Sequence, residues 1–371
     1  MPDTRGRSWP VTKTAERTGS GWPVLRGSIS MVLLIASLAA LFMLKLVLGS
    51  VAIPVSDVVG ILLGNGSDNA GWVAIVLNYR LPTAVVGIFA GASLAVAGLL
   101  MQTLFRNPLA GPDVFGLSAG ASLGVAVVVL SAGTAGASST ILGNLGPFGS
   151  IGIAVAASIG SGLVLLMILI ASRRIRSSMT ILILGLMFGY TASSFISILM
   201  HFALAERIQA YTVWSFGSFG GATWDQIQVL VLFASVGLLI GACQVKNLNA
   251  LLLGEQYAES MGLDFRRTRN VIFVTTAVLS GTVTAFCGPI AFIGIAVPHL
   301  CRALFSTANH AVLVPACILL GACLAVAADI IASVPGNEIT LPLNAITSLI
   351  GAPVVIWVIF SKNRQGMEMS V

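Results

Sequence analysis

Charged side chains are scarce in this chain of 371 residues, at 9% of the total. Soluble domains carry about 25%, and no polar stretch here is long enough to form a separate soluble domain. Hydrophobic residues make up 57%, and the mean hydropathy is +0.98. The composition therefore indicates an integral membrane protein. It also argues against nucleic acid as a partner, in spite of the net charge of +6.

The usual motifs of covalent and metal chemistry are missing as well. The nucleotide-binding pattern G-x-x-x-x-G-K-[ST] is absent, and the five cysteines form no C-x-x-C pair. The three histidines, His201, His299 and His310, lie at the ends of apolar runs, where we interpret them as packing or interface residues. We therefore expect no catalytic residue, no metal site and no cofactor bound by this chain.

Acidic residues inside the apolar runs are nearly absent too. An ionisable residue within a membrane span is a functional candidate by default, and of the 13 acidic residues only Asp329 falls clearly within one. Proton relays usually need several such groups. A proton-coupled secondary transporter is therefore a disfavoured alternative. A structural or receptor membrane protein without transport is a further alternative.

Apolar segments of about 20 residues span a bilayer, and ten such segments are present. Ten spans place both termini on one side of the membrane. With that side cytoplasmic, the positive-inside rule holds for all of the 19 Lys and Arg residues except Lys45, Arg80 and Arg207. The predicted organisation is a basic cytoplasmic tail (1–27), one all-α ten-helix domain (28–361) and a short cytoplasmic tail (362–371). The predicted spans are 28–48, 82–104, 114–132, 149–171, 179–200, 227–244, 270–286, 289–305, 311–331 and 341–360.

Glycines recur at four-residue spacing in several of these segments, as at Gly87 and Gly91 and at Gly116, Gly120 and Gly124. This spacing lets helix backbones approach closely. We interpret it as packing within the subunit, with a dimer seam as the alternative.

The most polar stretch between two spans is 246–269, which carries seven charged residues. Its leucines, Tyr257, Ala258 and Met261 have roughly helical spacing, and Gly262 is a candidate C-cap. The pattern predicts a folded cytoplasmic segment rather than a slack linker. It leaves open whether this segment binds a partner protein or is an ordered loop.

Arg80 is exceptional because it precedes the second span on the outer side, against the charge rule. An outward-facing Arg could pair with an acidic residue of an external partner. The alternative is an Arg that only extends into the interface, as Lys45 could at the outer end of the first span.

A series of motifs in this chain resembles those of the FecCD/BtuC permease family. Members of this family are the membrane subunits of binding-protein-dependent ABC importers for iron–siderophores, haem and cobalamin. The matches run in order and at family spacing from about Arg80 to Phe360. They are Arg80–Pro82 (RLP), Gly91–Gly98, Met101–Asp113 (MQTLFRNPLAGPD), Gly116–Gly120, Trp214–Trp224, Leu253–Gly262 (LGEQYAESMG), Gly288–Gly294, Val297–Leu300, Ala328–Asp329 and Leu349–Pro353.

The resemblance implies a type II importer fold, with two ten-helix permeases around a central path and two cytoplasmic ATPases that bind ATP and Mg²⁺. A soluble binding protein delivers cargo from outside, and in relatives the Arg of R-L-P pairs with one of its carboxylates. The match implies roles for three groups of residues: ATPase coupling for Leu253, Gly254, Glu255, Ala258, Met261, Gly262 and Asp264; binding-protein docking for Arg80; and a cytoplasmic gate at Asn107, Pro108, Leu109, Ser177, Ser178 and Met179.

Two positions depart from the family pattern. Many relatives read R-L-P-R, but here the fourth residue is Thr83, and the final Arg of A-D-L-L-A-R is Ser333. We therefore expect a less basic docking face than is typical.

From these motifs we expect a permease in the bacterial plasma (inner) membrane that imports a metal chelate. A push on residues 254–264 would move helices 2 to 5 and 10 around the cargo. Ferric siderophore is the first candidate cargo, with haem and cobalamin as alternatives that the sequence does not separate. A homodimer is favoured over pairing with a second, related permease.

Overall fold

The computed structural model describes residues 22–67, 69–131, 147–175, 177–333 and 340–368. Every regular element in these ranges is a helix. The first half of the chain contains α1 (Trp22–Val47), α2 (Val55–Leu62), α3 (Ala70–Ile75), the π-helix η1 (Val76–Arg80), α4 (Leu81–Leu104), the short η2 (Pro112–Phe115), α5 (Leu117–Ser131), α7 (Pro147–Arg174) and α8 (Ser178–Phe202). The second half contains α9 (Ala205–Ser215), α10 (Trp224–Cys243), α11 (Val245–Leu251), α12 (Glu255–Ser260), α13 (Phe265–Cys287), α14 (Ile293–Phe305), α15 (His310–Ala332) and α16 (Leu343–Glu368).

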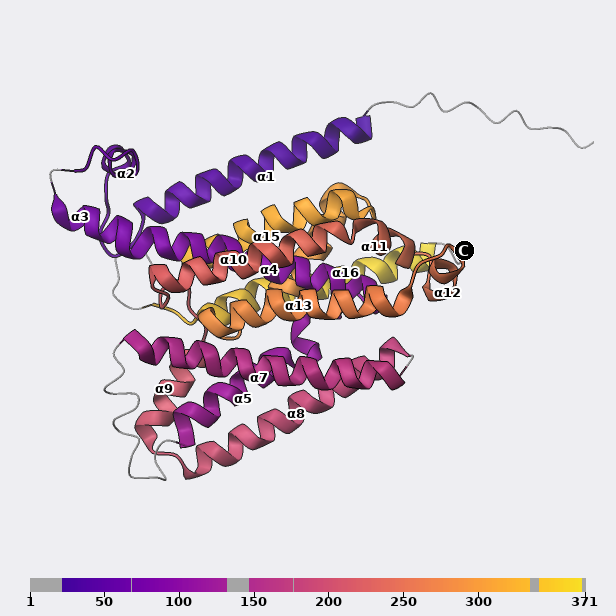
Figure 1. Ribbon diagram of the computed structural model, residues 1–371. Helices are drawn as coiled ribbons and strands as arrows, with labels where there is room; N and C mark the ends of the chain where they lie inside the picture. Colours follow the sequence, from indigo (N-terminus) through magenta and orange to yellow (C-terminus); the bar gives the residue numbers. More distant parts are fainter. Residues whose placement is uncertain (1–21, 68, 132–146, 176, 334–339, 369–371) are drawn as a thin grey trace, which may run out of the picture.

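The helices form two groups that lie side by side (Figure 1). Helix α4 is the buried centre of the larger group and packs against α10, α13, α14 and α15. The smaller group consists of α5, α7, α8 and α9, and α13 contacts α5 and α7 to join the two. Helix α1 lies along the outside of the larger group, against α15.

Each predicted span coincides with a helix, which confirms the all-helical membrane fold. In the part of the chain that the structure describes, seven helices are long and apolar enough to cross a membrane. The other three predicted spans match shorter apolar helices, 117–130, 293–305 and 343–357. The count of ten spans and the cytoplasmic placement of both termini stay predictions. The predicted tails lie mostly outside the described residues, although α1 begins at Trp22 and α16 runs to Glu368.

The second span starts earlier than the sequence predicted, because α3, η1 and α4 form one continuous helical run from Ala70 to Leu104. Pro82 has no N–H and normally ends or begins a helix. Here one turn of π-helix precedes it, and Nε1 of Trp224 donates to the carbonyl of Leu77 in that turn at 3.2 Å. The preceding α2 packs with the end of α1 around a separate apolar cluster that contains Leu46, Ile53 and Val58.

Glycines allow the closest helix contacts, as the four-residue spacing predicted. A Cβ at Gly91 on α4 would overlap the carbonyl of Gly321 on α15, and a Cβ at Gly124 on α5 would overlap that of Ala156 on α7. Gly120 likewise faces Gly160 on α7. These contacts confirm that the pattern serves packing within the subunit.

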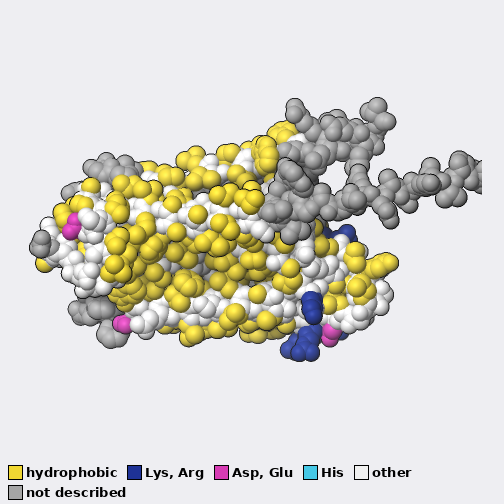
Figure 2. Space-filling view, turned by 90° about the horizontal axis from the view of Figure 1, so that it is seen from above, with side chains coloured by type: hydrophobic (Ala, Val, Ile, Leu, Met, Phe, Trp, Pro, Cys, Tyr) yellow, Lys and Arg dark blue, Asp and Glu magenta, His cyan; other side chains and the backbone are white. Residues whose placement is uncertain are grey.

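The two ends of the bundle differ in charge. Figure 2 shows a broad hydrophobic surface with Lys and Arg gathered at the end that carries α11 and α12 in Figure 1. The opposite end, with α2, α3 and α9, holds the three exceptions to the charge rule. There Lys45 pairs with Asp329, Arg80 bonds to carbonyls that include that of Leu46, and Arg207 donates to the carbonyl of Val129 at the end of α5. We take the α11–α12 end as the cytoplasmic end.

Candidate functional site

The polar stretch 246–269 is folded, as predicted, into α11, α12 and the start of α13, and we call it the coupling segment. Two glycines shape it. Gly254, with φ of 108°, lets the chain turn between α11 and α12, and Gly262, with φ of 89°, follows the end of α12. Because residues other than glycine rarely adopt such angles, the backbone conformation explains why glycine stands at both positions. Asp264 caps α13, since its Oδ1 accepts from the N–H of Arg267 at 3.0 Å.

One face of the coupling segment is buried and the other is apolar and open. Leu248, Leu251 and Ala258 pack into the main core. On the other side, Leu253, Tyr257 and Met261 are 59%, 64% and 62% exposed. Large apolar side chains that gather at the polar end of a membrane protein indicate a protein-docking surface. We call these three residues the docking face.

The coupling segment is bonded to the rest of the bundle at its first helix. The Oδ1 atom of Asn249 on α11 accepts from the N–H of His310 at 2.9 Å, and a ring nitrogen of His310 lies 2.8 Å from the hydroxyl oxygen of Thr103 on α4. A Cβ on Gly254 would lie 3.3 Å from the guanidinium of Arg106, next to the first predicted gate loop. The segment therefore contacts α4 and α15 and lies close to Arg106, the residue before the gate loop.

That gate loop, Asn107 to Leu109, is a compact turn. Oδ1 of Asn107 accepts from the N–H of Leu109 at 2.9 Å, which is an Asx turn. The carbonyl of Pro108 lies 2.7 Å from Nε2 of His299 on α14, and the Leu109 side chain is exposed. The loop is thus fixed from α14 while Leu109 projects from it.

The second predicted gate segment begins α8. The hydroxyl of Ser177 caps the helix by accepting from the N–H of Thr180, and Met179 is exposed. Between them Ser178 is buried, and its hydroxyl donates to Oε1 of Glu255 at 2.8 Å. The structure thereby joins a predicted gate residue to a predicted coupling residue.

Arg80, the predicted docking residue, lies at the opposite end and is 7% exposed. Its Nη1 donates to the carbonyls of Leu46 and Val47, at 2.8 Å each, and its Nη2 donates to that of Val51. These carbonyls end α1 and begin the following loop, where helix carbonyls lack partners. In this conformation the guanidinium therefore faces the protein, and its docking role stays a prediction.

The two departures from the family pattern have local partners. The hydroxyl of Thr83 lies within hydrogen-bonding distance of the carbonyls of Tyr79 and Arg80, in its own helix. Lys45 donates to the hydroxyl oxygen of Ser333 at 3.0 Å and lies 2.7 Å from Oδ2 of Asp329. Lys45 is therefore a buried ion-pair residue rather than one that extends to the interface.

Sequence reasoning missed several residues that hold the gate and the coupling segment. Gln102 on α4 donates to the carbonyl of Ile295 at 3.1 Å and accepts from Arg302 at 2.7 Å. Arg269, at the start of α13, donates to carbonyls at the end of α7. For Gln102 the available signal was a large polar side chain in an otherwise apolar helix, which indicates a buried hydrogen bond but not its partner. Arg269 gave no such signal, because it stands among other charged residues at the start of α13.

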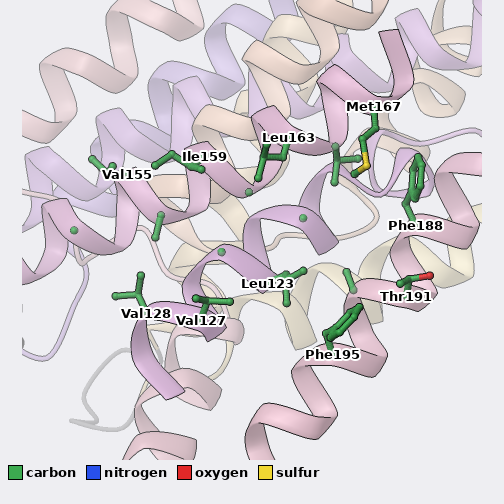
Figure 3. Close-up of a pocket in the computed structure, with 17 residues that line it drawn as sticks. Leu123, Val127, Val128, Val155, Ile159, Leu163, Met167, Phe188, Thr191 and Phe195 are labelled. Carbon is green, nitrogen blue, oxygen red and sulfur yellow. The ribbon is translucent and has the colours of Figure 1, made fainter. Parts of the chain in front are cut away.

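An apolar groove of about 660 Å³ lies between α7 and α8 above α5 (Figure 3). Val155, Ile159 and Leu163 line one side and Phe188 and Phe195 the other. No charged side chain lines it. Among the described residues no group of three or more His, Cys, Asp or Glu side chains could hold a metal ion. The groove is therefore not a candidate metal site.

Asp113 is the first acidic residue after the gate loop in the sequence. Burial raises the pKa of its carboxyl above the usual value, and the hydroxyl of Ser118, which donates to Oδ1 at 2.8 Å, opposes that rise. The hydrogen bond fixes η2 to the start of α5. We therefore assign Asp113 a structural role, which is to hold the start of α5.

Comparison with known proteins gives three consistent results. The family model of the FecCD transport family matches residues 37–361. The chain is 33% identical to the vitamin B12 import system permease protein BtuC of Salmonella paratyphi A over 289 residues, which are 78% of this chain and 84% of the relative. It is 34% identical to the BtuC of Escherichia coli O6:H1 over the same length and coverage.

The fold is also similar to a solved structure, that of a transporter assigned to the metal-chelate ABC type, in an inward-facing conformation. The TM-score is 0.77 at 22% identity, and the match covers 90% of this chain and 99% of that one.

Proposed function

Because the chain belongs to the FecCD transport family, we propose that it is the membrane permease of an ATP-driven importer that carries a metal chelate from a binding protein into the cytoplasm. It is a multi-pass permease of the bacterial plasma (inner) membrane. In this proposal two partner ATPase subunits bind ATP and Mg²⁺, and this chain does no covalent chemistry.

The observation that carries the proposal is the docking face on the coupling segment. Leu253, Tyr257 and Met261 project from a segment whose other side is anchored in the core. A surface of this kind fits a cytoplasmic protein partner, because three large apolar side chains are costly to leave in water. We assign the ATPase to this face, with Glu255, Gly262 and Asp264 shaping its edge.

We propose that motion of the ATPase is transmitted to the transport path through the bonds of the coupling segment. Ser178 joins it to the first turn of α8, and the guanidinium of Arg106, the residue before the gate loop, lies close to Gly254. A displacement of the coupling segment thus acts on both predicted gate segments. We propose that ATP binding and hydrolysis use this connection to alternate the path between its outward-open and inward-open states.

On the outer side we propose that the binding protein docks over the layer of α2, α3 and η1, with Arg80 as its cationic contact. An ion pair with the binding protein requires the guanidinium to turn away from the carbonyls of Leu46 and Val47. Without the Arg residues usual at positions 83 and 333, Arg80 would carry more of the docking charge.

For the cargo we propose a ferric siderophore first. Cobalamin is the second candidate, because the named relatives are vitamin B12 import permeases, and haem is the third. The apolar character of the helices suits a large cargo that must not bind tightly on its way. For the assembly we propose a homodimer of this chain.

The rival class, a proton-coupled transporter, needs ionisable groups that are free to exchange protons. Asp329 is not such a group, because Lys45 lies 2.7 Å from its carboxylate. The ion pair gives Asp329 a structural partner on α1.

The proposal is tested by purifying the tagged chain in nanodiscs and identifying the proteins and coloured ligands that co-purify. We expect an ATPase whose rate rises when the binding protein and its cargo are added. The absorbance spectrum of the cargo separates siderophore, haem and cobalamin. A permease that binds no ATPase and moves cargo with a proton gradient would overturn the assignment.

A further inference from the structure

Among the described residues that are fully buried, Arg269 has the largest side chain. It carries a charge, yet the proposed function gives it no role. It lies in the first turns of α13, at the end of the coupling segment, and is 2% exposed. Burying a guanidinium is unfavourable unless its donors are satisfied. The contacts of Arg269 therefore have to offset this cost.

Those contacts join α13 to the end of α7. The Nη2 atom of Arg269 donates to the carbonyl of Ser172 at 2.6 Å, and Nη1 donates to that of Ile175 at 3.3 Å. The last carbonyls of a helix lack intrahelical partners and form the negative end of its dipole. Arg269 thus caps α7 from another helix, with the ring of Phe265 5.6 Å from its guanidinium carbon.

A second contact lies beside the first. The hydroxyl oxygen of Ser172 is 3.2 Å from Oδ1 of Asn270, the residue after Arg269. We call Arg269 and Asn270, with the end of α7 that they hold, the α7 clasp. Because adjacent residues leave a helix in different directions, these two side chains hold α7 against α13 in orientation as well as in distance.

The clasp holds the end of α7, and the Ser178 bond holds the start of the next helix, α8. Ser172 lies in the last turn of α7 and Ile175 directly follows that helix, while Ser178 begins α8. Glu255 bonds to Ser178 and Arg269 to the end of α7, and both residues belong to the coupling segment. A displacement of the coupling segment is therefore applied to the ends of α7 and α8 together.

We propose that Arg269 is a positioning residue that makes the coupling segment and the end of α7 move as one body, so that motion of the ATPase reaches the gate. The inference rests on the proposed function and adds a residue that touches neither the ATPase nor the cargo. The docking face is separate from the clasp. Loss of the clasp therefore leaves the ATPase bound, but the conformational change of the ATPase no longer moves the helices.

The test compares Arg269→Gln, Arg269→Lys and Arg207→Gln in liposomes that contain the full complex of permease and co-purifying ATPase. Arg207 is the matched control, because it also donates to a helix-end carbonyl, that of Val129, but at the outer end. The quantities measured are ATPase binding, ATP hydrolysis and cargo transported per ATP.

For Arg269→Gln we expect unchanged ATPase binding, continued hydrolysis and a tenfold or greater loss of cargo per ATP. Arg269→Lys should recover part of that loss, because an ammonium group can still donate to a carbonyl, and Arg207→Gln should keep the normal ratio. A normal ratio in Arg269→Gln would overturn the proposal. Failure of the unaltered chain to bind an ATPase would instead overturn the proposed function.

A second measurement covers the case in which Arg269→Gln fails to fold. In a background with the exposed Cys243 replaced by Ser, Ser172→Cys and Asn270→Cys are joined by a short bifunctional thiol reagent. If the two positions move as one body, the cross-linked complex keeps its transport rate. If the cross-link abolishes transport, the two positions must separate during the cycle and the proposal is wrong.

Discussion

The hydroxyl of Ser178 donates a hydrogen bond of 2.8 Å to the carboxylate of Glu255. Ser178 begins α8, one of the two predicted gate segments, and Glu255 begins α12, next to the docking face. The bond spans 77 residues of sequence. It is a direct connection between the surface where we place the ATPase and a helix that we expect to open and close the path.

Removing this bond should uncouple transport from ATP hydrolysis. Hydrogen bonds to charged groups contribute about 1.5–3 kcal/mol, so in Ser178→Ala we expect several-fold less cargo per ATP in proteoliposomes. Ser194→Ala on the same helix is the control, because that hydroxyl bonds to its own helix at the carbonyl of Tyr190. Equal ratios in the two variants would mean that the bond carries no coupling.

Charge reversal of the acceptor is a stronger form of the same change. Glu255→Arg places a cation beside the Ser178 hydroxyl and close to Arg269, so we expect loss of both ATPase association and uptake. Co-purification and uptake assays check this, and unchanged values in both would remove Glu255 from the coupling site.

The docking face predicts a loss of ATPase affinity when a large side chain is truncated. Exposed aromatic residues that become buried at an interface contribute about 2 kcal/mol or more when they are hot spots, which is roughly a 30-fold change. We expect this order of weakening in Tyr257→Ala, measured by titrating the ATPase onto permease in nanodiscs. Gln256→Ala, exposed on the same helix, should bind normally, and an equal loss in both variants would contradict the assignment.

The pair formed by Lys45 and Asp329 predicts a stability effect rather than a transport effect. Removing one partner of a buried ion pair costs about 3–5 kcal/mol, whereas replacing both by apolar residues is often neutral. Lys45→Met and Asp329→Leu should each lower the thermal unfolding temperature in detergent, and the double variant should recover most of the loss. Additive losses in the double variant would show that the two side chains act independently.

Arg80 offers a test that separates docking from helix capping. A Cβ on Gly49 would lie 2.7 Å from Nη2 of Arg80, so Gly49→Ala should push the guanidinium away from the α1 carbonyls. If Arg80 docks the binding protein, Gly49→Ala raises the affinity for the binding protein at low salt, and Arg80→Glu abolishes that affinity. Low salt is used because exposed ion pairs are strongest at low ionic strength.

The opposite pattern would contradict that role. If Gly49→Ala weakens binding-protein affinity, or if Arg80→Glu leaves it unchanged at low salt, Arg80 acts through the position of α1 and not through its charge. Binding in nanodiscs at two salt concentrations distinguishes these outcomes.

The helices and the folded coupling segment could be predicted from the sequence because their signals are local. Apolar runs of fixed length mark the spans, and Gly254 and Gly262 mark turns that need positive φ. The π-helix before Pro82 was missed, because the carbonyl it frees is bonded by Trp224, which is 147 residues away from Leu77.

Side-chain partners were the larger omission. Lys45 was interpreted as an interface residue and Arg80 as outward-facing, since both stand at the ends of apolar runs. Their partners, Asp329 and the carbonyls of α1, are brought near only by the packing of α1 against α15 and η1. Local sequence contains no signal for such pairs.

The most direct test of the central claim is uptake of cargo into proteoliposomes that contain this chain and its co-purified ATPase, with either ATP or a proton gradient as the energy source. The account predicts accumulation that requires ATP, the ATPase and the cargo-loaded binding protein. Accumulation driven by the proton gradient in liposomes that contain the permease alone would contradict it.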